Sequence, residues 1–252
     1  RYMDTATATV CAHPVFPVCL EWPSVLETRA LLGTQLTNDE SARGVHAAHD
    51  LHIFRPIQAG EKLRTSATLI SVEAIKPGAG YTLRLDTVDT ANKLICQTFQ
   101  YGIYRGVSIE GSAKSSEAAP AAPVSARLND STTIISVPAG SAHTYPECAR
   151  IWNPIHTDRK FAQDAGLPDI ILHGTATLAL SISELINIFT EGQPDRVVRL
   201  GGRFAAIVLM PSNLQLRTSD CYRNTDGLTT VSYAISTAQG EPAISGGFFV
   251  FR

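Results

Sequence analysis

The sequence predicts an α+β protein built from two similar units that lie side by side. Two apolar helical segments, 17–32 and 174–189, are each followed by runs of alternating apolar and polar residues with turn residues between them. Period-two alternation is typical of antiparallel strands. A helix that is apolar around most of its circumference is buried around most of it. We therefore expect, in each unit, one long helix wrapped by a curved antiparallel sheet.

The two units are separated by residues 106–127. This segment contains an Ala/Ser/Pro-rich run and shows no periodicity, which is typical of a linker. We predict an N-terminal unit over residues 1–105, a linker over 106–127 and a C-terminal unit over 128–252.

The strand segments of the two units correspond in order. They begin at Ile53, Leu63, 80 and 93 in the first unit, and at Arg203, Leu214, 227 and 245 in the second. The pattern indicates a weak duplication. Tyr2 stands in the first unit where His156 stands in the second, so we expect the N-terminal unit to be degenerate and to lack the chemistry of the C-terminal one.

Composition and charge favour a small-molecule partner. The chain has 252 residues, 44% of them hydrophobic, and a formal net charge of −2. A chain without a basic cluster lacks the positively charged surface with which proteins bind nucleic acid or an anionic membrane. No apolar run reaches the roughly 18–20 residues that span a bilayer.

Five scattered cysteines favour a reducing compartment. We expect a cytoplasmic protein, or an organellar one if a segment precedes Arg1.

Two motifs carry the candidate chemistry. His156 follows an Asn-Pro turn that begins at Asn153, and Gly174 opens the second apolar helix. Histidine titrates near neutral pH and is a common general acid or base. The free N–H groups of a helix N-terminus stabilise a developing oxyanion. We therefore predict that His156, Asn153 and Gly174 are catalytic; the alternative is that His156 is a buried structural histidine.

Further residues are candidates for substrate contact. They are Ile151, Trp152, His173, Tyr145 and Arg203. Each has a structural alternative: packing for Trp152, a hydrogen bond at the helix entrance for His173, and a solvated or paired strand position for Arg203. Arg55, like Arg203, could contact the substrate or occupy a solvated or paired strand position. His143 is a further candidate for the pocket, on the same segment as Tyr145.

Two carboxylates lie near the motif. Asp158 stands where a helix over 158–165 begins, so we expect it to cap that helix. Glu147 would reach the site only through a rearranged loop. His46, His49 and His52 do not predict a metal site, because on a regular strand His49 points to the face opposite His46 and His52.

These motifs resemble the MaoC-like, (R)-specific enoyl-CoA hydratases, known as hydratase 2, which have the double hot-dog fold. Members usually read S-G-D-x-N-P-[LI]-H, where the Asp and the His share acid/base work on a water. Here Asn153, His156 and Gly174 match the family positions, whereas Ile151 replaces the aspartate and Arg150 replaces a glycine. The resemblance implies the fold and an acyl thioester substrate.

We therefore expect a lyase of fatty acid metabolism that adds or eliminates water at C2–C3 of an acyl thioester, with CoA as the expected thiol, or of a related activated carbonyl compound. It would need no metal and no redox cofactor. Two alternatives follow from Ile151: a non-catalytic or partner-dependent acyl-CoA-binding subunit, and a tailoring dehydratase or isomerase acting on a non-thioester substrate. The assembly would be a monomer with an internal pseudo-dimer, or a homodimer.

Overall fold

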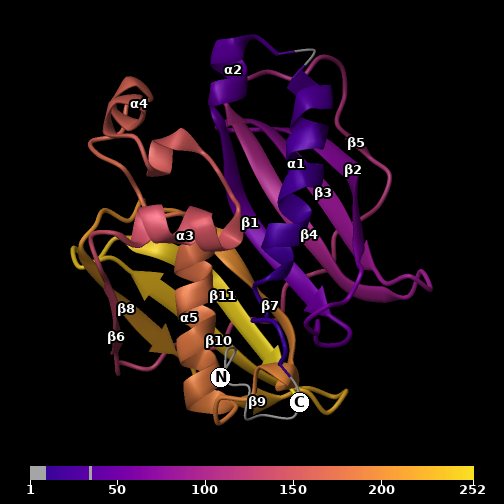
Figure 1. Cartoon of the computed structure of the whole chain (residues 1–252), viewed down its shortest axis with the longest axis vertical. Helices are drawn as coiled ribbons and strands as arrows, with labels where there is room; N and C mark the ends of the chain where they lie inside the picture. Colours follow the sequence, from indigo (N-terminus) through magenta and orange to yellow (C-terminus); the bar gives the residue numbers. More distant parts are fainter. Residues whose placement is uncertain (1–9, 34–35) are drawn as a thin grey trace.

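The structure, a computed structural model, describes residues 10–33 and 36–252 (Figure 1). The N-terminal unit contains α1 (Pro17–Gly33), α2 (Asn38–Ala42), β1 (Gly44–Ile53), β2 (Arg64–Ile75), β3 (Gly78–Val88) and β4 (Leu94–Arg105). The C-terminal unit contains β6 (Thr133–Val137), α3 (Ser141–Ala149), η1 (Pro154–His156), α4 (Arg159–Asp164), α5 (Gly174–Phe189), η2 (Pro194–Arg196), β7 (Val197–Phe204), β8 (Ser212–Thr218), β9 (Tyr222–Arg223), β10 (Thr229–Ser236) and β11 (Pro242–Phe251). The two long predicted helices are confirmed as α1 and α5.

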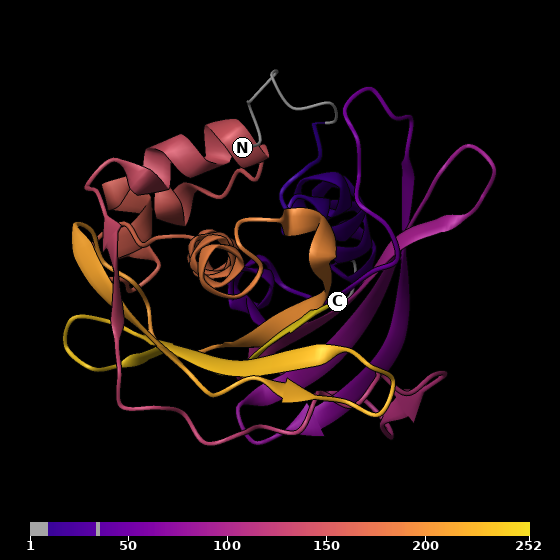
Figure 2. The same ribbon diagram turned by 90° about the horizontal axis from the view of Figure 1, so that it is seen from below.

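The predicted sheets of the two units join into one antiparallel sheet. Its described strands run in the order β5-β2-β3-β4-β1-β7-β11-β10-β8-β6, with β9 paired to β10. The join is the pairing of β1 with β7, in which Leu51 lies opposite Leu200. A Cβ on Gly201 would lie 2.2 Å from the His49 carbonyl oxygen, so glycine permits this close pairing. Figure 2 shows α1 and α5 on the same, concave side of the curved sheet.

Helix α5 is the central helix of the C-terminal unit. Its buried residues are Ala176, Thr177, Leu178, Ser181, Ile182, Leu185 and Ile186. The prediction that this helix is buried around most of its circumference fails at its C-terminal end, where Ile188 is 49% exposed. The sheet covers only one side of the helix, so this end faces solvent. None of the described helices is both long and apolar enough to cross a membrane.

Strand β1 departs from regular alternation. A β-bulge lies between His46 and Ala48, and it brings the rings of His46 and His49 to 5.4 Å between centroids. The expectation that His46 and His49 point to opposite faces is therefore wrong, because a bulge adds one residue and reverses the facing of what precedes it. His52 lies on the other face, where it pairs with Asp50.

The segment between the units follows the outer face of the sheet. A short strand that the sequence did not predict, β5 (Lys114–Ser115), pairs with β2 at the sheet edge. The Ser116 amide donates to the Ile70 carbonyl at 2.9 Å, and the Arg199 guanidinium donates to the Ala121 carbonyl at 2.8 Å. Tyr2, the counterpart predicted for His156, lies outside the described residues.

Candidate functional site

The loop after α3 holds His156 in place. Arg150 ends α3 in the left-handed conformation, with φ 55°. Asn153 then caps the short helix η1, and its side-chain oxygen accepts from the Ile155 amide at 3.4 Å. Pro154 occupies the first position of η1, where its missing N–H is not needed. The Asn-Pro pair thus forms the turn that positions the His156 side chain in the protein interior.

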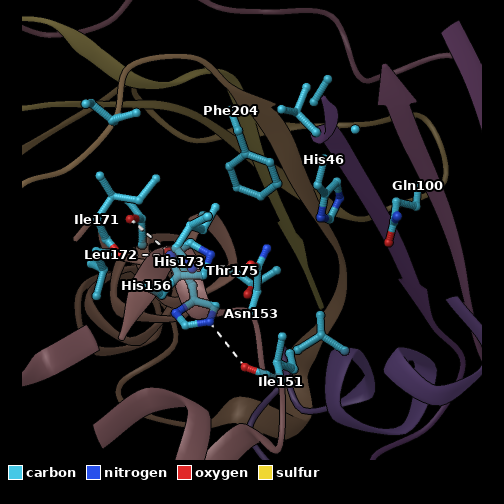
Figure 3. A pocket seen from close by; sticks show the side chains of 18 of the residues that line it. His46, Gln100, Ile151, Asn153, His156, Ile171, Leu172, His173, Thr175 and Phe204 are labelled. Carbon is cyan, nitrogen blue, oxygen red and sulfur yellow. Dashed lines mark hydrogen bonds between the residues drawn. The ribbon is translucent and has the colours of Figure 1, made fainter. Parts of the chain in front are cut away.

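One hydrogen bond sets the tautomer of His156. Its Nδ1 lies 2.8 Å from the Ile171 carbonyl oxygen, which only accepts, so Nδ1 carries the proton (Figure 3). Nε2 is left with a lone pair, because the ring's hydrogen bond to the described residues is made through Nδ1. Burial lowers the pKa of His156 below its ordinary value of 6.5, and the bond to Ile171 partly opposes that effect. The imidazole is therefore neutral at pH 7 and has a free basic nitrogen.

His173 supports His156 from one side. The two rings stack with centroids 3.6 Å apart and planes inclined by 22°. Nε2 of His173 donates to the Ile151 carbonyl at 3.2 Å, so the structural hydrogen bond expected at the helix entrance is present. Burial, followed by the neighbouring His156, lowers the pKa of His173 to about 3. The ring therefore stays neutral and fixes the plane of its partner.

Helix α5 brings its N-terminus to the same place. Its first residue is Gly174, and the His173 side chain makes no capping bond. Within the described part of the chain, no group accepts from the amides of Gly174 and Thr175. A Cβ on Gly174 would lie 3.2 Å from the ring of Phe204, so the glycine lets the helix start pack against that ring. Free amides and the helix dipole together favour a negative charge here.

A cavity of about 330 Å³ connects these groups. Its lining includes five residues that the sequence singled out: Ile151, Asn153, His156, His173 and Gly174. The other three predicted contact residues are not among the described residues that line it. Trp152 is 54% exposed, Tyr145 packs behind His173 with ring centroids 5.1 Å apart, and Arg203 is exposed on β7.

The remaining sequence candidates have structural positions. Asp158 caps α4, accepting from the Phe161 amide at 2.8 Å, which confirms its predicted role. Glu147 is exposed on α3, His143 is exposed and bonds to the Thr157 carbonyl, and Arg55 pairs with Glu61. No group of three or more His, Cys, Asp or Glu side chains that could hold a metal ion occurs in residues 10–33 and 36–252.

The carboxyl group that does line the cavity was missed by sequence reasoning. Glu21 of α1 is 2% exposed and accepts from the Thr98 hydroxyl at 2.5 Å. Burial raises its pKa to about 7, and the bond to Thr98 partly opposes this. The only signal in the sequence was an acidic residue inside an apolar helical segment, and such a signal does not say which face the residue occupies.

Comparisons with known proteins agree with this geometry. The family described as the MaoC-like domain matches residues 117–239. The peroxisomal multifunctional enzyme type 2 of Mus musculus is 26% identical over 69% of this chain and 24% of its own length. The peroxisomal enoyl-CoA hydratase 2 of Arabidopsis thaliana is 42% identical over 23% of this chain and 18% of its own length. The match thus spans about a quarter or less of each of these curated relatives.

Solved structures extend the likeness to the whole chain. The MaoC-like dehydratase from Phytophthora capsici has a TM-score of 0.80 at 19% identity, covering 99% of this chain and 85% of that one. Rv0216 of Mycobacterium tuberculosis, described as having a double hotdog fold, has a TM-score of 0.59 at 16% identity, covering 99% and 86%. The predicted double hot-dog fold is confirmed, and residues 117–239 match the MaoC-like domain that the sequence motifs resemble.

Proposed function

We propose that this protein is a hydro-lyase that adds water to, or eliminates it from, C2–C3 of an acyl thioester, with CoA as the thiol. The observation that supports this most directly is the free Nε2 of His156 in the same cavity as the free amides at the start of α5. The relatives named above as hydratase and dehydratase are consistent with that chemistry.

In the hydration direction, Nε2 of His156 takes a proton from water as the water oxygen bonds to C3 of the enoyl thioester. The C2–C3 π electrons move toward the thioester carbonyl, whose oxygen becomes negative. The Gly174 N–H, with that of Thr175 beside it, stabilises this oxyanion. The imidazolium then returns its proton to C2, which completes the addition. Elimination follows the same steps in reverse.

Ile151 limits which substrates suit this site. The residue lines the cavity where the resembling family carries an aspartate, and an alkyl side chain transfers no proton. Losing one of two acid/base groups costs on the order of 10²–10⁴ in rate. We therefore infer that the substrate is activated, with the proton at C2 acidified by a second carbonyl or by conjugation.

The test is the rate at which purified protein consumes the enoyl absorbance of 2-enoyl-CoA thioesters, plain and activated. His156→Ala should lower kcat by on the order of 10²–10⁴ with a smaller change in KM, because the histidine acts on the reacting atoms. His52→Ala is the matched control, since this histidine pairs with Asp50 on the outer face of the sheet. Equal activity of wild type and His156→Ala on every active substrate would refute the mechanism.

Ile151 favours a second candidate function, a subunit that binds acyl thioesters without turning them over. Its support is the apolar residue at the position of a proton-transfer group in an otherwise formed pocket. Calorimetric binding of a saturated acyl-CoA, together with no change in the absorbance of any enoyl-CoA, would favour this function over the hydro-lyase.

A further inference from the structure

The end of the cavity away from His156 lies within the N-terminal unit. There it is lined by Glu21 and Arg29 of α1, His46 of β1 and Gln100 of β4. Figure 3 shows His46 and Gln100 across the cavity from His156 and His173. Phe204 connects the two ends: its ring meets that of His46 edge-on at 4.9 Å and packs against Gly174 on the other side. An acyl chain whose thioester oxygen sits at Gly174 therefore passes Phe204 to reach this end.

This end is polar although it is buried. Glu21 is 2% exposed, Gln100 is 5% exposed and Thr98 is fully buried. In the register of the sheet, Gln100 lies opposite His49, which is itself 2% exposed. The bulge in β1 adds His46 to the same face. A pocket that served only an alkyl chain would carry apolar side chains here, because burying polar groups without partners is unfavourable.

Several polar atoms in this region lack partners. They are Nε2 of Gln100, both ring nitrogens of His49 and Nε of Arg29, all buried among the described residues. Buried polar groups in native proteins are nearly always hydrogen-bonded, so such a cluster indicates a missing polar partner. Gln100 and Arg29 line the cavity end, whereas His49 is not among the residues that line it. The partner that Gln100 and Arg29 lack would therefore lie inside the cavity.

The atoms that face the cavity specify the partner further. His46 donates from Nε2 to the Ala48 carbonyl at 3.0 Å, so its Nδ1 offers a lone pair. Gln100 offers both an acceptor and a donor. One oxygen of Glu21 is held by Thr98, and the other is free to bond a ligand. A ligand group that both donates and accepts suits this set, whereas an alkyl chain end satisfies none of it.

We propose that the acyl group carries a hydroxyl on the part of the chain beyond C3, and that Gln100, His46 and Glu21 recognise it. The hydroxyl donates to Nδ1 of His46 or to the amide oxygen of Gln100, and it accepts from the amide N–H of Gln100 or from the protonated Glu21. This inference rests on the proposed function insofar as the ligand is an acyl thioester.

The test compares matched acyl-CoA thioesters that differ only in carrying no oxygen, a hydroxyl or a keto group, with the oxygen moved along the chain. Binding of the saturated, unreactive members is measured by calorimetry, and turnover of the 2-enoyl members by absorbance. At the best position the hydroxyl should tighten binding at least about tenfold over the plain chain. The keto group should give less than the hydroxyl, because it only accepts.

Gln100→Met should remove most of the preference, since it keeps the side chain's length but deletes its polar atoms. Gln97→Met is the matched control on the same strand, where Gln97 bonds Asp86 outside the cavity. Glu21→Gln, which keeps the shape and a donor, provides a second variant with a smaller expected loss should Gln100→Met unfold.

Equal binding of plain and hydroxylated chains at every position, or a preference that Gln100→Met leaves intact, overturns the inference. Tighter binding of a hydroxylated chain without any turnover would support the inferred recognition of a hydroxyl. The same result would contradict the proposed hydro-lyase function.

Discussion

At position 151 an apolar side chain faces the cavity beside a histidine that carries a free nitrogen. The backbone carbonyl of Ile151 accepts a hydrogen bond from His173, and this bond holds the His173 ring stacked against that of His156. The residue thus retains the positioning function of the loop while its side chain contributes no acid/base chemistry. We therefore expect the proposed chemistry of the site to depend on this one side chain.

Ile151→Asp should raise the rate on unactivated 2-enoyl-CoA by on the order of 10² or more, since it supplies a second acid/base group. It should also lower the free energy of unfolding by about 2–5 kcal/mol, because Ile151 is 6% exposed within the core. Initial rates and thermal unfolding measure the two effects. Ile151→Asn is the control, with a similar loss of stability and no gain in rate; a folded Ile151→Asp protein without any gain would contradict the expectation.

The element that couples the two ends of the cavity is the start of α5 packed on the end of β7. Gly174 lies against Phe204, and Phe204 lies against His46 of β1. The amides proposed to hold the oxyanion are therefore positioned by a ring from the sheet. Displacement of either partner moves both the oxyanion site and the passage to the N-terminal unit.

Gly174→Ala should lower kcat and destabilise the protein by about 1–3 kcal/mol, because the added methyl group lies 3.2 Å from the Phe204 ring. Phe204→Leu in the same chain should restore much of the stability by making room. Gly140→Ala is a suitable control, as this glycine starts α3 with φ −83° and its Cβ would meet nothing within 4 Å. Unchanged stability and kcat in Gly174→Ala would show that the contact is not tight in solution.

Across the whole molecule, buried histidines make stability depend on pH. Burial lowers the pKa of His13 and His49 to about 4 and that of His173 to about 3, from 6.5. Their contribution is present above pH 6.5 and is lost as the pH falls through the folded values, since the unfolded chain then binds more protons. Glu21 has the opposite sign: with its pKa raised from 4.5 to about 7, its contribution is present below pH 4.5 and lost as the pH rises through 7.

The histidines outnumber the glutamate, so the melting temperature should fall as the pH is lowered from 6.5 to 4.5. His49 and His173 should each account for about 2 kcal/mol by pH 5. Thermal unfolding between pH 4.5 and 8 measures this dependence. Glu21→Gln should make it steeper by removing the opposing slope. A melting temperature that is constant between pH 6.5 and 4.5 would contradict the assignment of these histidines as buried and neutral.

The sequence by itself determined the features that depend on neighbouring residues: helices, turns and helix caps. The apolar segments predicted both long helices to within one residue at their ends, the Asn-Pro turn and the helix start indicated residues around His156 that line one cavity, and Asp158 was placed correctly as a cap. These features depend on side-chain periodicity and on bonds between residues a few positions apart, so they can be inferred without knowing the fold.

Only the tertiary structure decided which distant side chains share the cavity. The pairing of β1 with β7 joins the units, and the bulge at His46 turns a histidine inward. Glu21 and Gln100 then meet at the far end of the cavity that holds His156, while Trp152 and Arg203 remain outside its lining. Such placements depend on strand register and on one irregular residue, because a shift of one residue reverses the face on which a side chain lies.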